Sequence, residues 1–347
     1  MNSEIKDLQK IVSENYKEFE SVLSIEPLTF KFRVNNLLYL ALAGKKKYIL
    51  KRIKILNDFY GISDAAEKLE MISAVSDFLA KNDFPIEKVI VNKSGHFMLA
   101  FKQDTIRAFE YYESREFNSS DMQDTEAVFK LSKQLHSFPI EQLLKELPDS
   151  QQYLKAPYPL DETFKKAEWI SEKLNLERGE QWESLQSQFS KVIEAVPALL
   201  KWEKSHLYTL THLDLHPRNV IFREDNRPLM IDMDYMRLGN PYVCLGFSLT
   251  RLSFLQQPIR TLERLKTFLK ILTKVYLPVG EDAESFEKEV LKGALYIETE
   301  KIFRNLYRNY HTQNYRNFAE DVPAMHFPIY QLVNEYFQLT EVNEWKN

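Results

Sequence analysis

The sequence contains few of the residues that build disulfide-bonded, repetitive or loosely linked proteins. Its single cysteine, Cys244, excludes an internal disulfide framework and fits a reducing compartment. Only 8 glycines occur among 347 residues, so glycine-rich linkers are absent and any boundary between lobes is expected to be a short hinge. The sequence also contains no internal repeats and no long low-complexity tracts.

Neither a membrane nor a nucleic acid is expected as the main partner. No uninterrupted run of about 18 apolar residues is present, so no segment is predicted to span a bilayer. Residues 1–7 lack the basic-then-apolar design of a signal peptide, which makes the cytoplasm the expected location. The net charge of −4 gives no electrostatic reason to expect nucleic acid.

What remains is an ordinary globular composition, with 44% hydrophobic and 28% charged residues. A chain of this length has room for two lobes and a sizeable buried core. We expect an N-terminal lobe over residues 1–110 and a C-terminal lobe over residues 111–347.

The candidate catalytic and metal-binding residues lie in two stretches. These are Thr-His-Leu-Asp-Leu-His-Pro-Arg-Asn, residues 211–219, and Ile-Asp-Met-Asp, residues 231–234. Two short strands are predicted between them, at 220–222 and 229–231, around a polar turn. The loop then carries a carboxylate and an amide, and the second strand ends in another carboxylate. Such a set suits phosphoryl transfer, in which one carboxylate orients the attacking hydroxyl and two other oxygens hold Mg²⁺ on the phosphates.

The pattern H-x-D-x-x-x-x-N, a hairpin and then I-D-x-D resembles the aminoglycoside phosphotransferase and choline kinase superfamily of small-molecule kinases. The resemblance implies that Asp214 is the catalytic base and that Asn219 and Asp232 are Mg²⁺ ligands, with Asp234 adding to the metal or substrate site. It implies ATP as the phosphoryl donor. It also implies an α+β, bilobal, protein-kinase-like fold, with an antiparallel sheet plus a helix in the N-lobe and a mostly helical C-lobe.

The first third of the chain is predicted to contain the sheet of that N-lobe. Lys51 lies in the third strand and, by the resemblance, binds the α- and β-phosphates; a solvated strand lysine is the alternative. Glu70 on the following helix is the expected carboxylate partner of Lys51, with Glu67 in reserve. The predicted order is a helix at 3–23, strands at 28–33, 37–42 and 47–53, a helix at 63–79, and strands at 84–91 and 97–101.

Two segments of this lobe are expected to contact the nucleotide. The turn at 33–36 contains no glycine, so we expect Asn35 and Asn36, which tolerate positive φ, to approach the phosphates instead. Residues 106–112 are predicted to lead into the hinge, where backbone groups of Glu110, Tyr111 and Tyr112 would bind adenine. An ordinary aromatic strand is the alternative for that segment.

The C-terminal lobe is predicted to be helical. Residues 139–159, with four prolines, form a prolonged connector. His212 is expected to shape the catalytic turn, and Cys244 stands where the superfamily often has an aspartate that braces the loop. Aromatic and basic residues alternate over 303–316, either as a substrate mouth or, as helical spacing favours, as a core face with basic residues outside. Helices are predicted at 120–137, 160–174, 181–200, 244–255, 261–276, 283–310 and 329–339.

The leading hypothesis is an ATP-dependent phosphotransferase acting on a hydroxyl of a small molecule, such as a sugar or an amino alcohol or aminoglycoside. A catalytically quiet nucleotide-binding pseudokinase is the alternative, because the 33–36 turn lacks glycine and Cys244 replaces an aspartate. A metal-dependent phosphohydrolase using Asp232 and Asp234 would need no nucleotide. The sequence leaves open the acceptor, the choice between ATP and GTP, and the oligomeric state.

Overall fold

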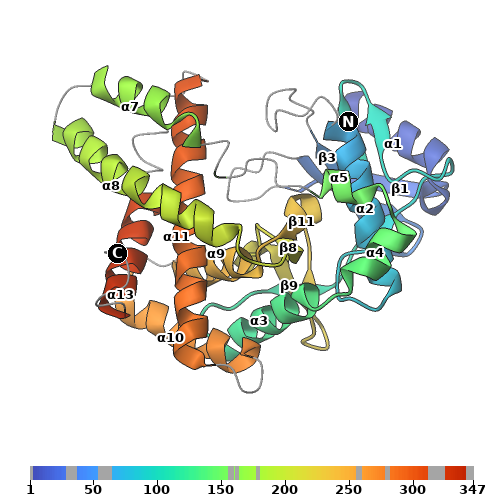
Figure 1. Ribbon diagram of the computed structural model, residues 1–347. Helices are drawn as coiled ribbons and strands as arrows, with labels where there is room; N and C mark the ends of the chain where they lie inside the picture. Colours follow the sequence, from blue (N-terminus) through green and yellow to red (C-terminus); the bar gives the residue numbers. More distant parts are fainter. Residues whose placement is uncertain are drawn as a thin grey trace. The chain divides into compact units, whose positions relative to one another are not determined.

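The chain folds into two compact units, which Figure 1 shows in a computed structural model. The first unit comprises residues 1–116, 139–157 and 220–236, and the second comprises 117–138, 158–219 and 237–347. An antiparallel sheet dominates the first unit and helices dominate the second, which confirms the predicted α+β class. The structure describes residues 3–28, 37–53, 65–154, 160, 164–176, 180–254, 260–277, 282–311 and 325–340.

The sheet of the first unit is antiparallel, with the strand order β1-β2-β3-β6-β4, and β5 pairs with β6. The predicted helix over 3–23 is wrong in its second half, because α1 ends at Asn15 and a strand begins at Val22. Tyr16 and Phe19 are three residues apart, which is a helical spacing, but a short turn after α1 is what buries both side chains. The strands are β1 (Val22–Pro27), β2 (Leu37–Ala43), β3 (Lys46–Ile53), β4 (Val89–Ile90), β5 (Leu99–Phe101) and β6 (Asp104–Glu110).

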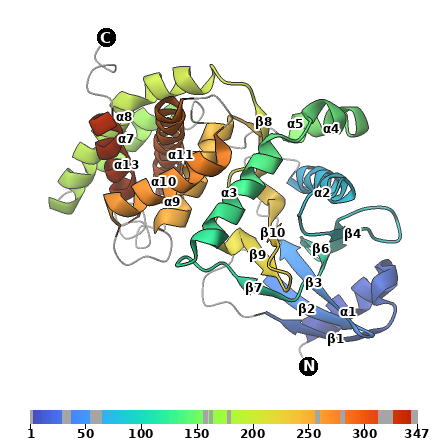
Figure 2. The same ribbon diagram turned by 90° about the horizontal axis from the view of Figure 1, so that it is seen from below.

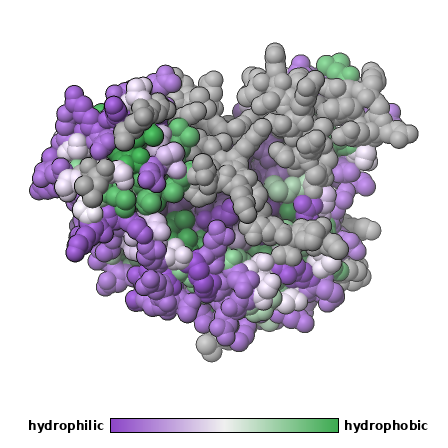
Figure 3. All heavy atoms as spheres, turned by 180° about the vertical axis from the view of Figure 1, so that it is seen from behind, coloured by the Kyte–Doolittle hydropathy of each residue, from purple (hydrophilic) through white to green (hydrophobic). Residues whose placement is uncertain are grey.

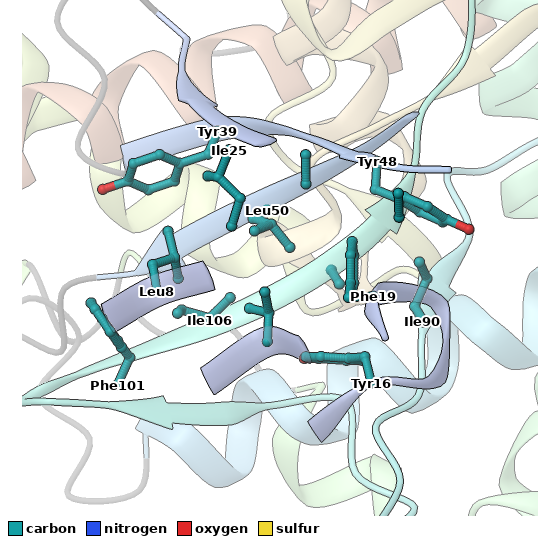
Figure 4. Packing of buried hydrophobic residues seen from close by; sticks show 14 residues of the cluster. Leu8, Tyr16, Phe19, Ile25, Tyr39, Tyr48, Leu50, Ile90, Phe101 and Ile106 are labelled. Atoms are coloured by element: carbon teal, nitrogen blue, oxygen red, sulfur yellow. The ribbon is translucent and has the colours of Figure 1, made fainter. Parts of the chain in front are cut away.

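One face of this sheet packs against α1 (Ser3–Asn15) and the turn after it. Figure 4 shows Tyr16 and Phe19 in the same apolar cluster as Leu50 and Ile106, and the Phe19 ring packs edge-on against Tyr48. Because side chains alternate along a strand, the residue after each of these apolar positions points to the opposite face. Helix α2 (Ala65–Lys81) contributes a serine to that opposite face, as described below.

The predicted hairpin is confirmed: β9 (Val220–Arg223) pairs antiparallel with β10 (Pro228–Met230). Strand β7 (Ser114–Glu116) extends it as a third strand. The predicted connector over 139–159 instead contains α4 (Ile140–Glu146) and α5 (Ser150–Tyr153). Its prolines at 139 and 148 flank the helices and do not interrupt them, and proline is tolerated at such positions.

The second unit is built around the long helix α11 (Ala283–His311), drawn in orange-red in Figure 1. Helices α7 (Ala167–Leu176), α8 (Glu180–Glu203), α9 (Pro241–Phe254) and α13 (Phe327–Thr340) all contact α11. Figure 2 shows α10 (Leu262–Tyr276) beside α3 (Met122–His136), and these two helices are in contact. Strand β8 (Thr209–His212) pairs with β11 (Met236–Gly239).

The described part of the chain contains no helix that is long and apolar enough to cross a bilayer. Figure 3 shows one face of the molecule, where hydrophilic residues prevail and hydrophobic residues gather in smaller patches.

Two glycines allow α9 and α11 to approach closely. A Cβ atom on Gly293 would lie 2.0 Å from the carbonyl oxygen of Tyr242, and one on Gly246 would lie 2.1 Å from the backbone nitrogen of Ala294. Real Cβ atoms essentially never come this close to backbone, so each helix must have a glycine where it meets the other. The pair therefore fixes the spacing of the two helices.

We expect Gly293→Ala to lower the free energy of unfolding by about 3 kcal/mol, because the new methyl group meets backbone atoms that cannot rotate away. Urea denaturation would measure the loss. Gly239→Ala is the control, since its nearest neighbour is the Thr211 side-chain oxygen at 3.3 Å, and we expect it to cost less than about 1 kcal/mol. Equal midpoints for the two variants would contradict the close helix contact.

Candidate active site

The loop after β8 holds Asp214 through its neighbours in sequence. Nδ1 of His212 accepts the backbone N–H of Asp214 at 3.1 Å. The side-chain amide of Asn219 donates to the Asp214 carbonyl at 2.8 Å and to its carboxylate at 3.3 Å. His212 is fully buried and Asn219 is nearly so. The predicted role of His212 in shaping the turn is confirmed, and Asp214 and Asn219 are in contact within the second unit.

Asp214 is held in its ionised form. Burial alone would raise the pKa of this carboxyl, but His216, with Nε2 at 3.5 Å, and the positive charge of Lys301 hold the pKa well below its usual value. An ionised carboxylate of low basicity can orient a hydroxyl without holding its proton tightly. Phosphoryl transfer through a loose transition state requires mainly this positioning.

Cys244 connects α9 to the same loop. Its Sγ donates to the carbonyl oxygen of His212 at 3.4 Å, inside the buried core. Burial raises the pKa of the Cys244 thiol to about 12, so the group stays protonated and remains a donor at neutral pH. The thiol therefore braces the loop backbone, the role that the resemblance assigns to an aspartate.

The first unit contains a buried cluster of opposite charges on the sheet face away from α1. Lys51 on β3 lies directly across from Arg107 on β6. Lys51 Nζ is 2.6 Å from a carboxylate oxygen of Asp232 and 2.6 Å from one of Asp234. The Arg107 guanidinium donates to the other oxygen of Asp234 and, at 3.3 Å, to Ser73 on α2. Lys51 is therefore a buried, paired cation, so the alternative of a solvated strand lysine is wrong.

The predicted pairing of Lys51 with Glu70 is not found. The two carboxylate oxygens of Glu70 accept the backbone N–H groups of Phe97 at 2.9 Å and Met98 at 2.8 Å. The reserve candidate, Glu67, accepts the hydroxyl of Tyr153 at 2.9 Å. The charge of Lys51 is already balanced by two aspartates, so it does not require a glutamate from the helix. Asn35 and Asn36 lie outside the described residues.

Sequence reasoning missed two members of the charged cluster. Glu87 accepts the backbone N–H of Asp232 at 2.7 Å, where Asp232 has left-handed dihedral angles of φ 60° and ψ 59°. Burial raises the pKa of Glu87 to about 7, against the opposing charge of Lys51. The other is Arg107, and the sequence did hold a signal for it, because a charged residue stands between the apolar residues Ile106 and Ala108 in the middle of a strand.

In the expected hinge, two backbone N–H groups already donate to carbonyl groups of the protein. The N–H of Glu110 donates to the Lys88 carbonyl at 3.0 Å, and that of Tyr111 to the Lys47 carbonyl at 3.3 Å. The hydroxyl of Tyr112 donates to the Glu110 carboxylate at 3.1 Å. Adenine bound here would have to use other backbone groups of the segment.

We expect Asp234→Asn to cost about 3–5 kcal/mol of stability, because it removes the carboxylate that both buried cations share. Asp232→Asn is the matched control. That side chain is 38% exposed, compared with 8% for Asp234, and it pairs with Lys51 alone, so the expected loss is about 1 kcal/mol. Denaturation of both variants in urea compares the two losses. A loss for Asp232→Asn as large as that for Asp234→Asn would show that Asp234 is not the central carboxylate.

Solved structures of other proteins share this fold. Among solved structures, a spectinomycin phosphotransferase in complex with ADP and spectinomycin aligns with a TM-score of 0.62 at 14% identity, over 95% of this chain and 98% of that one. An ethanolamine kinase from Plasmodium vivax aligns with a TM-score of 0.63 at 14% identity, over 96% and 89% of the two chains. An amicoumacin kinase in complex with AMP-PNP, Ca²⁺ and Ami aligns with a TM-score of 0.58 at 15% identity, over 100% of this chain and 98% of that one.

At these identities the structural matches establish a shared fold and no more. No curated protein matches the sequence. The profile of the phosphotransferase enzyme family, abbreviated APH, matches residues 30–270, which include Lys51, Asp214 and Asp232. The chain therefore belongs to the phosphotransferase enzyme family, the small-molecule kinases that its loop and hairpin motifs resemble.

Proposed function

We propose that this protein is an ATP-dependent kinase that phosphorylates a hydroxyl group of a small molecule. The observation that carries the proposal is the ionised carboxylate of Asp214, held by His212 and Asn219 in the loop that the family motif marks. The relatives bound to ADP or AMP-PNP support a nucleotide as the donor.

In the proposed reaction, Asp214 accepts a hydrogen bond from the acceptor hydroxyl and directs its oxygen toward the γ-phosphorus of ATP. The new oxygen–phosphorus bond forms as the bond from the γ-phosphorus to the bridging oxygen breaks, and ADP leaves. The hydroxyl proton passes to Asp214 and then to solvent. Most of the acceleration comes from placement and charge neutralisation.

Lys51 is proposed to bind phosphate oxygens of ATP. Its ammonium group already lies between two carboxylates, so a polyphosphate would replace one set of anionic oxygens by another. Arg107 would continue to neutralise Asp234 when Lys51 turns to the nucleotide. Asp234 would therefore still have a cationic partner after Lys51 binds the nucleotide.

Asn219 and Asp232 are proposed as Mg²⁺ ligands, with Asp234 as a further candidate. Amide and carboxylate oxygens are ligands that a hard cation prefers. The Asn219 amide nitrogen makes the bonds to Asp214, so the amide oxygen is the atom suited to a metal. Asp232 is the more exposed of the two aspartates. When bound, Mg²⁺ would neutralise charge on the phosphates.

We expect Asp214→Asn to reduce turnover on the order of a hundredfold or more while Mg·AMP-PNP still binds, because the amide keeps the shape but cannot accept the proton. ADP release measured over a panel of sugars, amino alcohols, homoserine and aminoglycosides gives turnover, and titration calorimetry gives binding. Asp225→Asn in the exposed hairpin turn is the control and should leave both unchanged.

The same assay separates the competing hypotheses. A quiet pseudokinase would bind the nucleotide and release no ADP with any acceptor. A metal-dependent phosphohydrolase would cleave a phosphate ester without nucleotide. Either result, or near-full activity of Asp214→Asn, would overturn the proposed function.

A further inference from the structure

Basic side chains of the second unit gather near the catalytic loop, and two of them have no carboxylate partner among the residues that the structure describes. Arg251 on α9 is 2.9 Å from Glu298, and Arg304 on α11 is 3.5 Å from Glu300. In the described part of the chain, no carboxylate lies within 4.0 Å of the charged groups of Lys301 or Arg237. The described carboxylates therefore neutralise the positive charge of this cluster only in part.

Lys301 lies close enough to Asp214 for their charges to interact, and the backbone of Arg237 contacts the strand that leads into the loop. Lys301 Nζ lies 5.0 Å from the centre of the Phe247 ring, and Phe247 follows Cys244 by about one helical turn. Cys244 in turn bonds the carbonyl of His212, two residues before Asp214. The carbonyl of Arg237 accepts the Thr211 hydroxyl at 3.0 Å, at the end of β8.

Burial makes the charged forms of both groups costly, which their lowered pKa values reflect. Burial and the neighbouring Arg304 lower the pKa of Lys301 to about 8, although Asp214 and Glu300 act in the opposite direction. Burial lowers the pKa of Arg237 to about 10. Cations whose pKa values fall although carboxylates are near gain from an additional negative charge.

We propose that the acceptor is a small molecule that carries an anionic group, a carboxylate or a phosphate, in addition to its hydroxyl. Lys301 together with Arg237 binds this anion, which places the hydroxyl at Asp214. The inference rests on the proposed phosphotransferase function and narrows its acceptor class. The positive charges disfavour cationic acceptors such as choline-like amino alcohols, since like charges brought together reduce affinity.

The test compares acceptors that differ in charge. Glycerate is paired with glycerol, and glucuronate with glucose, for the carboxylate. Glucose 6-phosphate paired with glucose tests the phosphate, and ethanolamine and an aminoglycoside represent cations. ADP release is measured for the wild-type protein, Lys301→Met, Lys301→Arg and Lys288→Met. The last variant makes the same change on the same helix, at a lysine that pairs with Glu284.

We expect the wild-type protein to prefer the anionic member of at least one pair. Lys301→Met should raise KM for that acceptor about tenfold or more, as expected for the loss of a charge-assisted hydrogen bond. The KM for ATP should be unchanged. Lys301→Arg should retain most of the preference, and Lys288→Met should behave as the wild-type protein. The acceptor pair whose anionic member is preferred shows whether the site binds a carboxylate or a phosphate.

A preference for neutral or cationic acceptors, or equal effects of Lys301→Met on every acceptor, would overturn the inference and leave the kinase function standing. If no acceptor is phosphorylated and titration calorimetry detects no Mg·AMP-PNP binding, the proposed function itself fails and the inference fails with it. A structural role of Lys301 alone would change the unfolding midpoint without changing the charge preference.

Discussion

The first unit depends on the neutralisation of two buried cations on neighbouring strands. Lys51 and Arg107 face each other across β3 and β6, and both are almost completely buried. Two positive charges in such a position repel each other and lose their hydration, so they require carboxylates in the same interior. Asp234 supplies one carboxylate to both cations, and Asp232 supplies another to Lys51. This requirement explains why residues 220–236, far along the chain, belong to the same unit as the N-terminal sheet.

The sequence predicted those features that depend on short spacing. The contact between Asp214 and Asn219 follows from their separation in one loop, and the hairpin follows from two apolar runs around a polar turn. Strand periodicity placed Lys51 within its strand, and the family resemblance of the loop and hairpin motif implied the α+β class. Local pattern was sufficient because backbone geometry over a few residues leaves few alternatives.

Partners that come from distant segments could not be predicted in the same way. The helix containing Glu70 was correctly placed after the third strand, yet its rotation about its own axis decides which residue faces Lys51. Periodicity gives the buried face of a helix without saying which neighbour lies against it. Glu70 accepts hydrogen bonds from the backbone of Phe97 and Met98. The partners of Lys51 are aspartates in the segment that follows the hairpin. Glu87 was missed for a related reason, since it acts on the backbone of Asp232 rather than on a charged side chain.

Helix α9 connects the two parts of the site in the second unit. Cys244 braces the backbone of the loop that carries Asp214, and Gly246, two residues further along the helix, lets α11 approach. The next residue, Phe247, lies beneath Lys301 of that same helix α11. The distance between Asp214 and Lys301 therefore depends on the packing of α9 against α11, which two backbone contacts at glycine hold fixed. If Asp214 and Lys301 bind the acceptor as proposed, this fixed spacing would select acceptors by the distance between hydroxyl and anion as well as by charge.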